Sequence, residues 1–273
     1  MTTVSQVRSS TSSSPPLGAL TRVLALPAIG AGLAGGLLMI LLMIIVMGAS
    51  GMGYATPLNI GMAAFVYTIV PPLSMFPSLM SMMGINLPSS VMSQLGGAIH
   101  AGHIPAAMVA KLAPMLMSMH LPASRVALLG QLMSGKATNA TVAQLMKQLP
   151  ASSRNAVMAA MPVSAGNVVV GSILHFAFAA FLGVAFFAII VGAAYMVPAL
   201  RSSTALVAAG VIGGAVVYVV NRWAILPHAN PMMALVPQLA FFLAHLLFGA
   251  VVGLILAVTL RRTSVRQLLP AGM

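Results

Sequence analysis

The sequence of residues 236–260, VPQLAFFLAHLLFGAVVGLILAVTL, contains no charged residue. Its polar side chains are those of Gln238, His245 and Thr259. About 20 consecutive apolar residues are enough to cross the hydrocarbon core of a bilayer as a helix. Similar stretches occupy residues 24–48, 167–194 and 203–222. The sequence therefore predicts an all-α integral membrane protein with a four-span helical bundle.

The composition of the whole chain agrees with a membrane location. Hydrophobic residues make up 60% of the chain and charged residues only 4%, and the mean hydropathy is +1.07. A soluble domain would be about a quarter charged. The chain has 12 Lys and Arg residues and no Asp or Glu. Such a basic excess would suggest nucleic acid in a soluble protein, but here basic residues flank hydrophobic segments. The predicted partners are anionic membrane lipids or other membrane subunits, and not nucleic acid.

The missing residue types also exclude several kinds of chemistry. Without Asp or Glu there is no carboxylate general base, no carboxylate proton relay and no acidic cation site. Without Cys there are no disulfides and no thiolate metal ligands. Enzymatic hydrolysis is therefore not expected.

Residues 57–83 are apolar, but they contain Pro57, Pro71, Pro72 and Pro77. Proline inside a helix costs roughly 3 kcal/mol, so we expect a broken, re-entrant or surface-lying segment here. With four spans, one side of the membrane carries six arginines, and the positive-inside rule makes that side cytoplasmic. We therefore predict a multi-pass protein of the cell membrane with both termini in the cytoplasm. The six arginines are Arg8, Arg22, Arg201, Arg261, Arg262 and Arg266.

These predictions divide the chain into five parts. Residues 1–22 and 263–273 are cytoplasmic tails, the first of them disordered. Residues 23–56 form the first span and an outer loop. Residues 57–165 form a methionine-rich helical insert on the extracytoplasmic side, and residues 166–262 form spans two to four. Within the insert, prolines begin four similar motifs, each of which predicts a short amphipathic helix; the motifs start at Leu87-Pro88, Ile104-Pro105, Leu121-Pro122 and Leu149-Pro150.

Two patterns of small residues occur twice along the chain. Spans one and three share Gly-x-x-Gly-Gly, and spans two and four share His-x-x-Phe-small-x-x-x-Gly. The patterns predict two tandem two-span repeats related by an axis along the membrane normal. The small residues at helical spacing are expected to let neighbouring helices approach closely. They are Gly32, Gly36, Gly210, Gly214, Ala179, Gly183, Gly249 and Gly253.

His175 and His245 occupy equivalent positions in this pattern. Each shares a helix face with the small residues four and eight positions later, so both should point into protein, roughly 10–14 Å inside the outer end of the span. An ionisable side chain in a membrane span is a candidate functional residue. The plain alternative is a histidine that only hydrogen-bonds neighbouring groups and stabilises the bundle. The functional alternatives are a shared metal or small-ligand site and a pH-sensing site.

The chain contains 23 methionines, many of them in the insert. Met115, Met117, Met119 and His120 follow one another closely, and His100 and His103 lie upstream. Thioether and imidazole groups suit Cu(I), so copper is a possible cofactor. Methionine is also a flexible filler of apolar faces, and residues i and i+2 of a helix do not face each other.

A polar, proline-rich stretch after span three is expected to form a turn over the outer mouth of the bundle. Asn221, His228 and Asn230 could line the path by which a ligand reaches the histidines. In the insert, Asn139-Ala140-Thr141 matches an N-glycosylation sequence.

Our leading hypothesis is a binding or accessory membrane subunit that holds a small ligand or a copper ion between His175 and His245. A transporter or channel for a small solute or ion is the second hypothesis. A structural assembly subunit of a membrane complex is the third.

Overall fold

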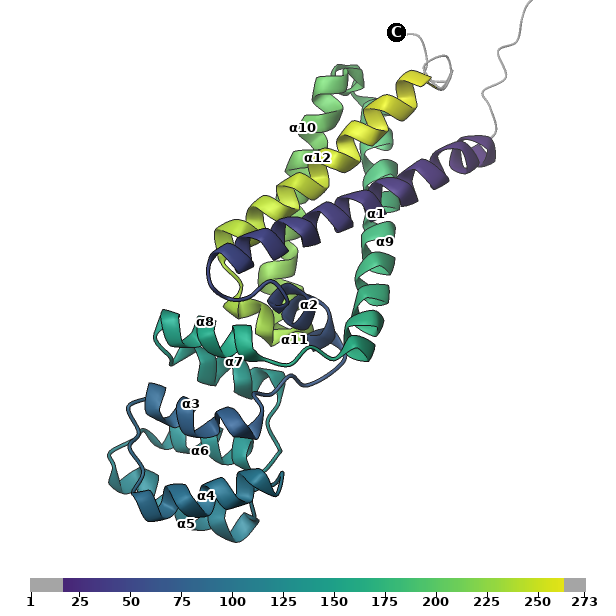
Figure 1. Ribbon diagram of the computed structural model, residues 1–273. Helices are drawn as coiled ribbons and strands as arrows, with labels where there is room; N and C mark the ends of the chain where they lie inside the picture. The colour runs from purple at the N-terminus through teal and green to yellow at the C-terminus, as the bar shows by residue number, and fades with distance from the viewer. Residues whose placement is uncertain (1–16, 263–273) are drawn as a thin grey trace, which may run out of the picture.

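The computed structural model describes residues 17–262, with side chains described from Leu24 onward, and it is all-helical over that range (Figure 1). Four helices are long and apolar enough to cross a membrane, which confirms the prediction of a multi-pass membrane protein. They are α1 (Leu17–Ala49), α9 (Ala165–Met196), α10 (Ser203–Val220) and α12 (Gln238–Arg262).

Two boundaries differ from the prediction. Helix α1 begins at Leu17, within the tail expected to extend to residue 22, while the rest of that tail and the C-terminal tail lie outside the described residues. Helix α10 continues through a π-helical turn, η4 (Asn221–Ile225), into α11 (Leu226–Ala229). The polar stretch expected to be a turn is thus helical as far as Ala229, and residues 230–237, which include η5 (Pro231–Leu235), separate it from the last span.

Helix α1 begins and α12 ends at one end of the bundle, which we call the terminal end (Figure 1). The insert packs on the opposite end, which we call the insert end. Arg201, in η3 (Pro198–Arg201), donates hydrogen bonds to the carbonyls of Ala194 and Tyr195, the last turn of α9. Arg261 Nε donates to Ser203 Oγ. Arginine thus ties helix ends together at the terminal end, where the carbonyl dipoles favour positive charge.

The four proline motifs of the insert each begin a helix, as predicted. Each proline lies at the residue just before the first helical turn, where its missing N–H costs no hydrogen bond. The helices are α4 (Ser89–His100), α5 (Ala106–Ser118), α6 (Ala123–Met133) and α8 (Ala151–Ala160).

Helix α7 (Asn139–Lys147) of the insert was not predicted, because it lacks the proline motif. Thr138 caps it by accepting a hydrogen bond from the Thr141 N–H. The Asn139 amide donates to the carbonyls of Ala64 and Tyr67, and its oxygen accepts from Ile69 N–H. The asparagine of the glycosylation sequence is therefore a structural connection between α7 and residues 64–69.

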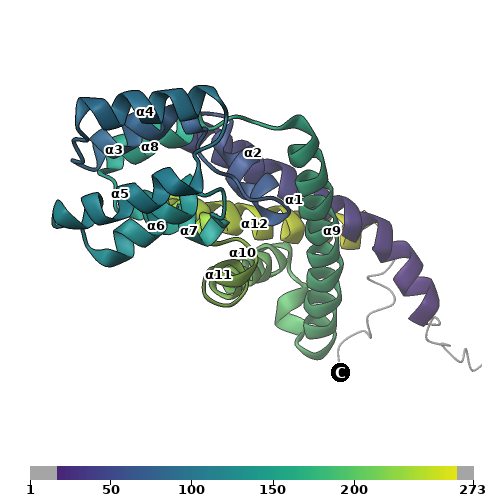
Figure 2. The same cartoon turned by 90° about the horizontal axis from the view of Figure 1, so that it is seen from below.

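The segment 57–83 is broken, as predicted. It forms α2 (Thr56–Gly61), η1 (Ala63–Phe65), η2 (Leu73–Met75) and α3 (Phe76–Met82). Helix α2 and η1 lie against the insert end of the membrane helices, and α3 packs among the insert helices (Figures 1 and 2).

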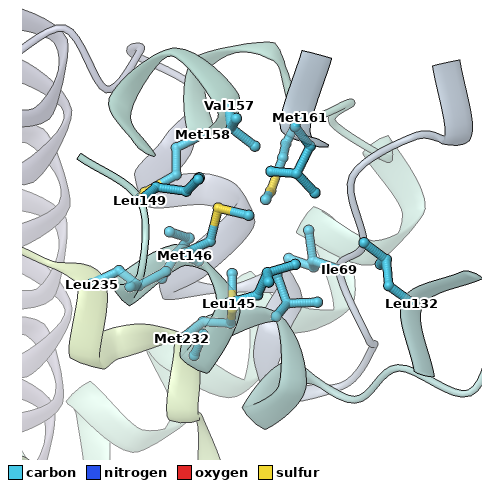
Figure 3. Close-up of a cluster of buried hydrophobic side chains, with 14 of the residues drawn as sticks. Ile69, Leu132, Leu145, Met146, Leu149, Val157, Met158, Met161, Met232 and Leu235 are labelled. Carbon is cyan, nitrogen blue, oxygen red and sulfur yellow. The ribbon is translucent and has the colours of Figure 1, made fainter. Parts of the chain in front are cut away.

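One hydrophobic core runs from the insert into the insert end of the bundle. Met146 and Met158 of the insert lie close to Met232 and Leu235 of η5 (Figure 3), and all four are buried. Buried polar side chains also connect the two regions: Asn230 donates to Ile60 O at 2.6 Å. A second core fills the terminal half of the bundle.

Candidate functional site: a histidine-lined cavity between the membrane helices

Helices α1 and α9 approach each other at glycine. A Cβ atom added to Gly32 would lie 2.2 Å from the carbonyl oxygen of Ala179, and one added to Gly183 would lie 2.3 Å from that of Ala28. No real side chain tolerates such distances, so glycine is required for this contact.

Helices α10 and α12 make the equivalent contacts. A Cβ atom on Gly210 would lie 2.2 Å from Gly249 O, one on Gly214 would lie 2.2 Å from His245 O, and one on Gly253 would lie 2.6 Å from Leu206 O. The small residues singled out in the sequence therefore do lie at the helix contacts, and the two pairs share the same sequence spacing of contact positions.

The close contacts direct both histidines into the protein. His175 lies one turn before Ala179 on α9, and its Nε2 atom is 3.5 Å from where a Cβ of Gly36 would be. His245 lies one turn before Gly249 on α12 and is 2% exposed. Both side chains line a single cavity of about 300 Å³ at the insert half of the bundle.

His245 has both ring nitrogens satisfied. Its Nδ1 is 2.8 Å from the carbonyl oxygen of Phe241, one turn earlier, and must carry the proton to donate there. The Nε2 atom is then an acceptor, and the Asn221 amide donates to it at 3.0 Å. Tyr218 and Phe241 pack edge-on against the ring. This histidine is held in one tautomer and one orientation.

His175 differs from His245 in its hydrogen bonding. Its Nε2 atom is buried and makes no hydrogen bond of standard geometry with the described residues, although the backbone of Gly36 interacts with the ring. A buried polar atom without a partner costs roughly 1–3 kcal/mol, so an unpaired nitrogen in the wall of a cavity is a position where a ligand would gain a hydrogen bond.

Asn221 is the first residue of the π-helical turn, and its own N–H still donates to the Val217 carbonyl as in the last turn of α10. Turns of π-helix are rare and frequently occur at functional sites. The Asn221 carbonyl accepts from the Leu226 N–H in the five-residue pattern of this turn, and the side chain reaches His245 from the next helix. Asn221 lines the cavity, as expected for a ligand path, but Asn230 is fully buried against Ile60 and His228 is exposed, and neither lines it.

Five methionines line the same cavity, three of them from α1. No sequence pattern separates these methionines from packing residues. They are Met39, Met43, Met47, Met62 and Met233.

The methionine and histidine residues of the insert are not assembled into a site. His100, His103, His120, Met117 and Met119 are exposed, and Met115 lies in a separate shallow pocket with Lys111. Among residues 17–262 no group of three or more histidines comes together.

Residues 57–65 close the cavity at the insert end, a feature that sequence analysis missed. A Cβ on Gly171 would lie 2.1 Å from Met62 O, and Ser172 Oγ lies 2.7 Å from Met62 Sδ. Gly171 lies one turn before His175, so the small-residue face of α9 extends further than the repeated motif. That extra glycine was the available signal.

At the terminal end the cavity is closed by Phe248, which lies against Gly35 and packs on Phe186 with ring centroids 5.9 Å apart.

No known protein family matches this chain, and no curated protein or solved structure is similar to it. Fold and site together define the class: a multi-pass membrane protein, all-helical over the described residues, with a histidine-lined cavity between its helices.

Proposed function

We propose that this protein is a binding or accessory subunit of the cell membrane that holds a small ligand between His175 and His245. The observation that carries the proposal is that the buried Nε2 of His175, in the wall of a cavity shared with His245, makes no hydrogen bond of standard geometry. A cavity of about 300 Å³ is at the lower end of the range of small-molecule sites, which is roughly 300–1,000 Å³.

Binding is better supported than transport because the cavity does not continue through the bundle. The terminal half is filled by large side chains, among them Phe186, Phe187 and Phe248, each no more than 7% exposed. A channel would require this core to open.

The architecture that we propose for this subunit has two tandem two-span repeats, α1 with α9 and α10 with α12, and an extracytoplasmic insert. The repeated glycine contacts support the duplication. Arg201, Arg261 and Arg262 all lie at the terminal end, which supports cytoplasmic termini and an outward-facing cavity.

A copper ion is a second candidate ligand, and the methionines of the cavity wall favour it. Cu(I) accepts thioether and imidazole ligands. His245 already donates its Nδ1 proton to a backbone carbonyl, as most metal-binding histidines do. Its Nε2 would bind metal after Asn221 moves away.

Analysis of the purified full-length protein tests the proposal. Bound metal is measured by mass spectrometry of the digested protein, and bound organic molecules by mass spectrometry of a solvent extract. His175→Ala is compared with His228→Ala, which removes an exposed histidine outside the cavity. We expect a near-stoichiometric ligand in the wild type and in His228→Ala, and at least tenfold less in His175→Ala. Equal content in all three proteins, or none in any, would refute the proposal.

A further inference from the structure

The walls of the histidine cavity are closed on all sides except one. Four of its lining residues are substantially exposed, and all belong to α9, η1 or η4: Phe65 is 38% exposed, Leu174 50%, Phe178 43% and Ile225 38%. Helices α9 and α10 make few contacts, the clearest at Gly213 and Phe186 near the terminal end. From there α9 diverges from α10 toward the insert end (Figure 1).

The gap between α9 and α10 faces the bilayer. Both helices carry exposed, apolar side chains, including Phe181 on α9 at 64% and Ile212 on α10 at 64%. Both helices are long and apolar enough to cross the membrane, so lipid chains cover these surfaces. A molecule dissolved in the membrane can reach the cavity sideways, whereas a water-soluble one must pass residues 57–65.

The lining chemistry restricts the ligand further. Among the described residues that line the cavity none is Lys or Arg, so a phosphate head group would find no counter-charge. The chain has no Asp or Glu, so an amine or another organic cation would find none either. The groups that can hydrogen-bond are the imidazoles of His175 and His245 and the amide of Asn221. They suit a neutral oxygen: a carbonyl accepts from an imidazole or amide N–H, and a hydroxyl can donate or accept.

We infer that the cavity takes a neutral, lipid-soluble molecule with a carbonyl or hydroxyl head group, which enters from the bilayer through the gap between α9 and α10. The head group hydrogen-bonds His175 Nε2, and the apolar remainder lies against the methionines and leaves through the gap. This inference rests on the proposed function and specifies the ligand of the same site. Two sources fit the chemistry, a tailed quinone and a neutral lipid such as diacylglycerol.

The protein contains its own reporter of binding at this gap. Trp223 is the only tryptophan in the chain. It belongs to η4, two residues after Asn221, and packs against Tyr218 with ring centroids 5.7 Å apart. A quinone bound in the cavity would quench its fluorescence.

The experiment titrates ubiquinone-2 into the full-length protein in lipid nanodiscs and records Trp223 fluorescence. Two matched pairs of variants test the route. Val217→Phe and Leu182→Phe place a ring in the cavity wall, whereas Val216→Phe and Val184→Phe place the same ring on exposed neighbouring positions. Two pairs are used so that one variant that fails to fold does not end the test.

We expect saturable quenching in the wild type and in the exposed variants. In the folded cavity variants and in His175→Ala the Kd should be at least tenfold higher. Diacylglycerol and phosphatidylglycerol are then added as competitors, and the shift in apparent melting temperature with each molecule alone is measured. If diacylglycerol, and not phosphatidylglycerol, shifts the melting temperature or displaces ubiquinone-2, the ligand is a neutral lipid. Binding of ubiquinone-2 that diacylglycerol does not displace identifies the quinone class.

Three outcomes would overturn the inference: neither neutral molecule binding, equal binding in cavity and exposed variants, or tighter binding of phosphatidylglycerol than of either. If a metal or polar molecule nevertheless co-purifies and is lost in His175→Ala, the proposed function stands and only this inference fails. If nothing co-purifies either, both fail.

Discussion

The helix pairs α1/α9 and α10/α12 are built on the same spacing of small residues, yet their histidines differ. In α10/α12 the position one turn after the histidine is Gly249, and His245 is hydrogen-bonded at both nitrogens. In α1/α9 that position is Ala179, and the Nε2 of His175 makes no hydrogen bond of standard geometry with the described residues. One motif thus gives a histidine that stabilises the bundle and a histidine that is available to a ligand. Asn221 makes part of this difference, because among the described residues no side chain donates to His175 as Asn221 donates to His245.

Gly249→Ala should lower the stability of the protein more than any other substitution discussed below. The new Cβ would lie 2.1 Å from Gly210 O, a backbone atom that cannot move without separating α10 from α12. We expect destabilisation at or above the top of the roughly 1–3 kcal/mol range for overpacking, measured as a fall in apparent melting temperature. Gly192→Ala is the control because a Cβ there would meet nothing within 4 Å. Equal melting of the two variants would show that this contact is not tight.

His245→Ala should cause the second-largest loss of stability, and this loss should be greater than that caused by His175→Ala. It leaves the Phe241 carbonyl and the Asn221 amide without their partner, at roughly 2 kcal/mol. His175→Ala removes no side-chain hydrogen bond of standard geometry and only the interaction of the ring with the Gly36 backbone, so we expect less than about half that loss. A double-mutant cycle of His245→Ala with Asn221→Ala should give a coupling of about 1 kcal/mol. If the two histidine variants have the same apparent melting temperature, the two histidines do not differ in their hydrogen bonding as the structure indicates.

The aromatic contact between the two helix pairs should make an intermediate contribution to stability. Phe186 of α9 and Phe248 of α12 meet edge-on, so Phe186→Leu and Phe248→Leu should be coupled by about 0.5–1.5 kcal/mol. Phe181→Leu with Phe248→Leu is the control, because Phe181 is 64% exposed. Additive effects in the first cycle would mean that the pairs are joined elsewhere.

Ala179→Gly should have the smallest effect. It gives α1/α9 the residue that α10/α12 has, and removes one buried methyl group. Glycine inside a helix costs roughly 0.5–1 kcal/mol relative to alanine. A loss as large as that of Gly249→Ala would show that the Ala179 methyl group is essential to packing.

The site was only partly predictable from the sequence. The repeated motif placed His175 and His245 on faces that meet other helices, because small residues at a spacing of four indicate close contact. It could not show that Asn221 would partner only one of them, since that depends on how α10 packs against α12. The insert methionines were the prominent copper candidates, but helix geometry spreads them over the surface, while α1 methionines line the cavity.

The sequence by itself determined the class of protein, the four spans and the proline-started helices of the insert. Those features depend on local composition: a long apolar helix must lie in lipid, and proline favours the start of a helix. Only the tertiary structure decided which polar groups remain unpaired and where the cavity opens. Those features depend on which side chains from distant segments meet, and on residues 57–65 closing one end of the space between α9 and α10 while the side toward the bilayer stays open.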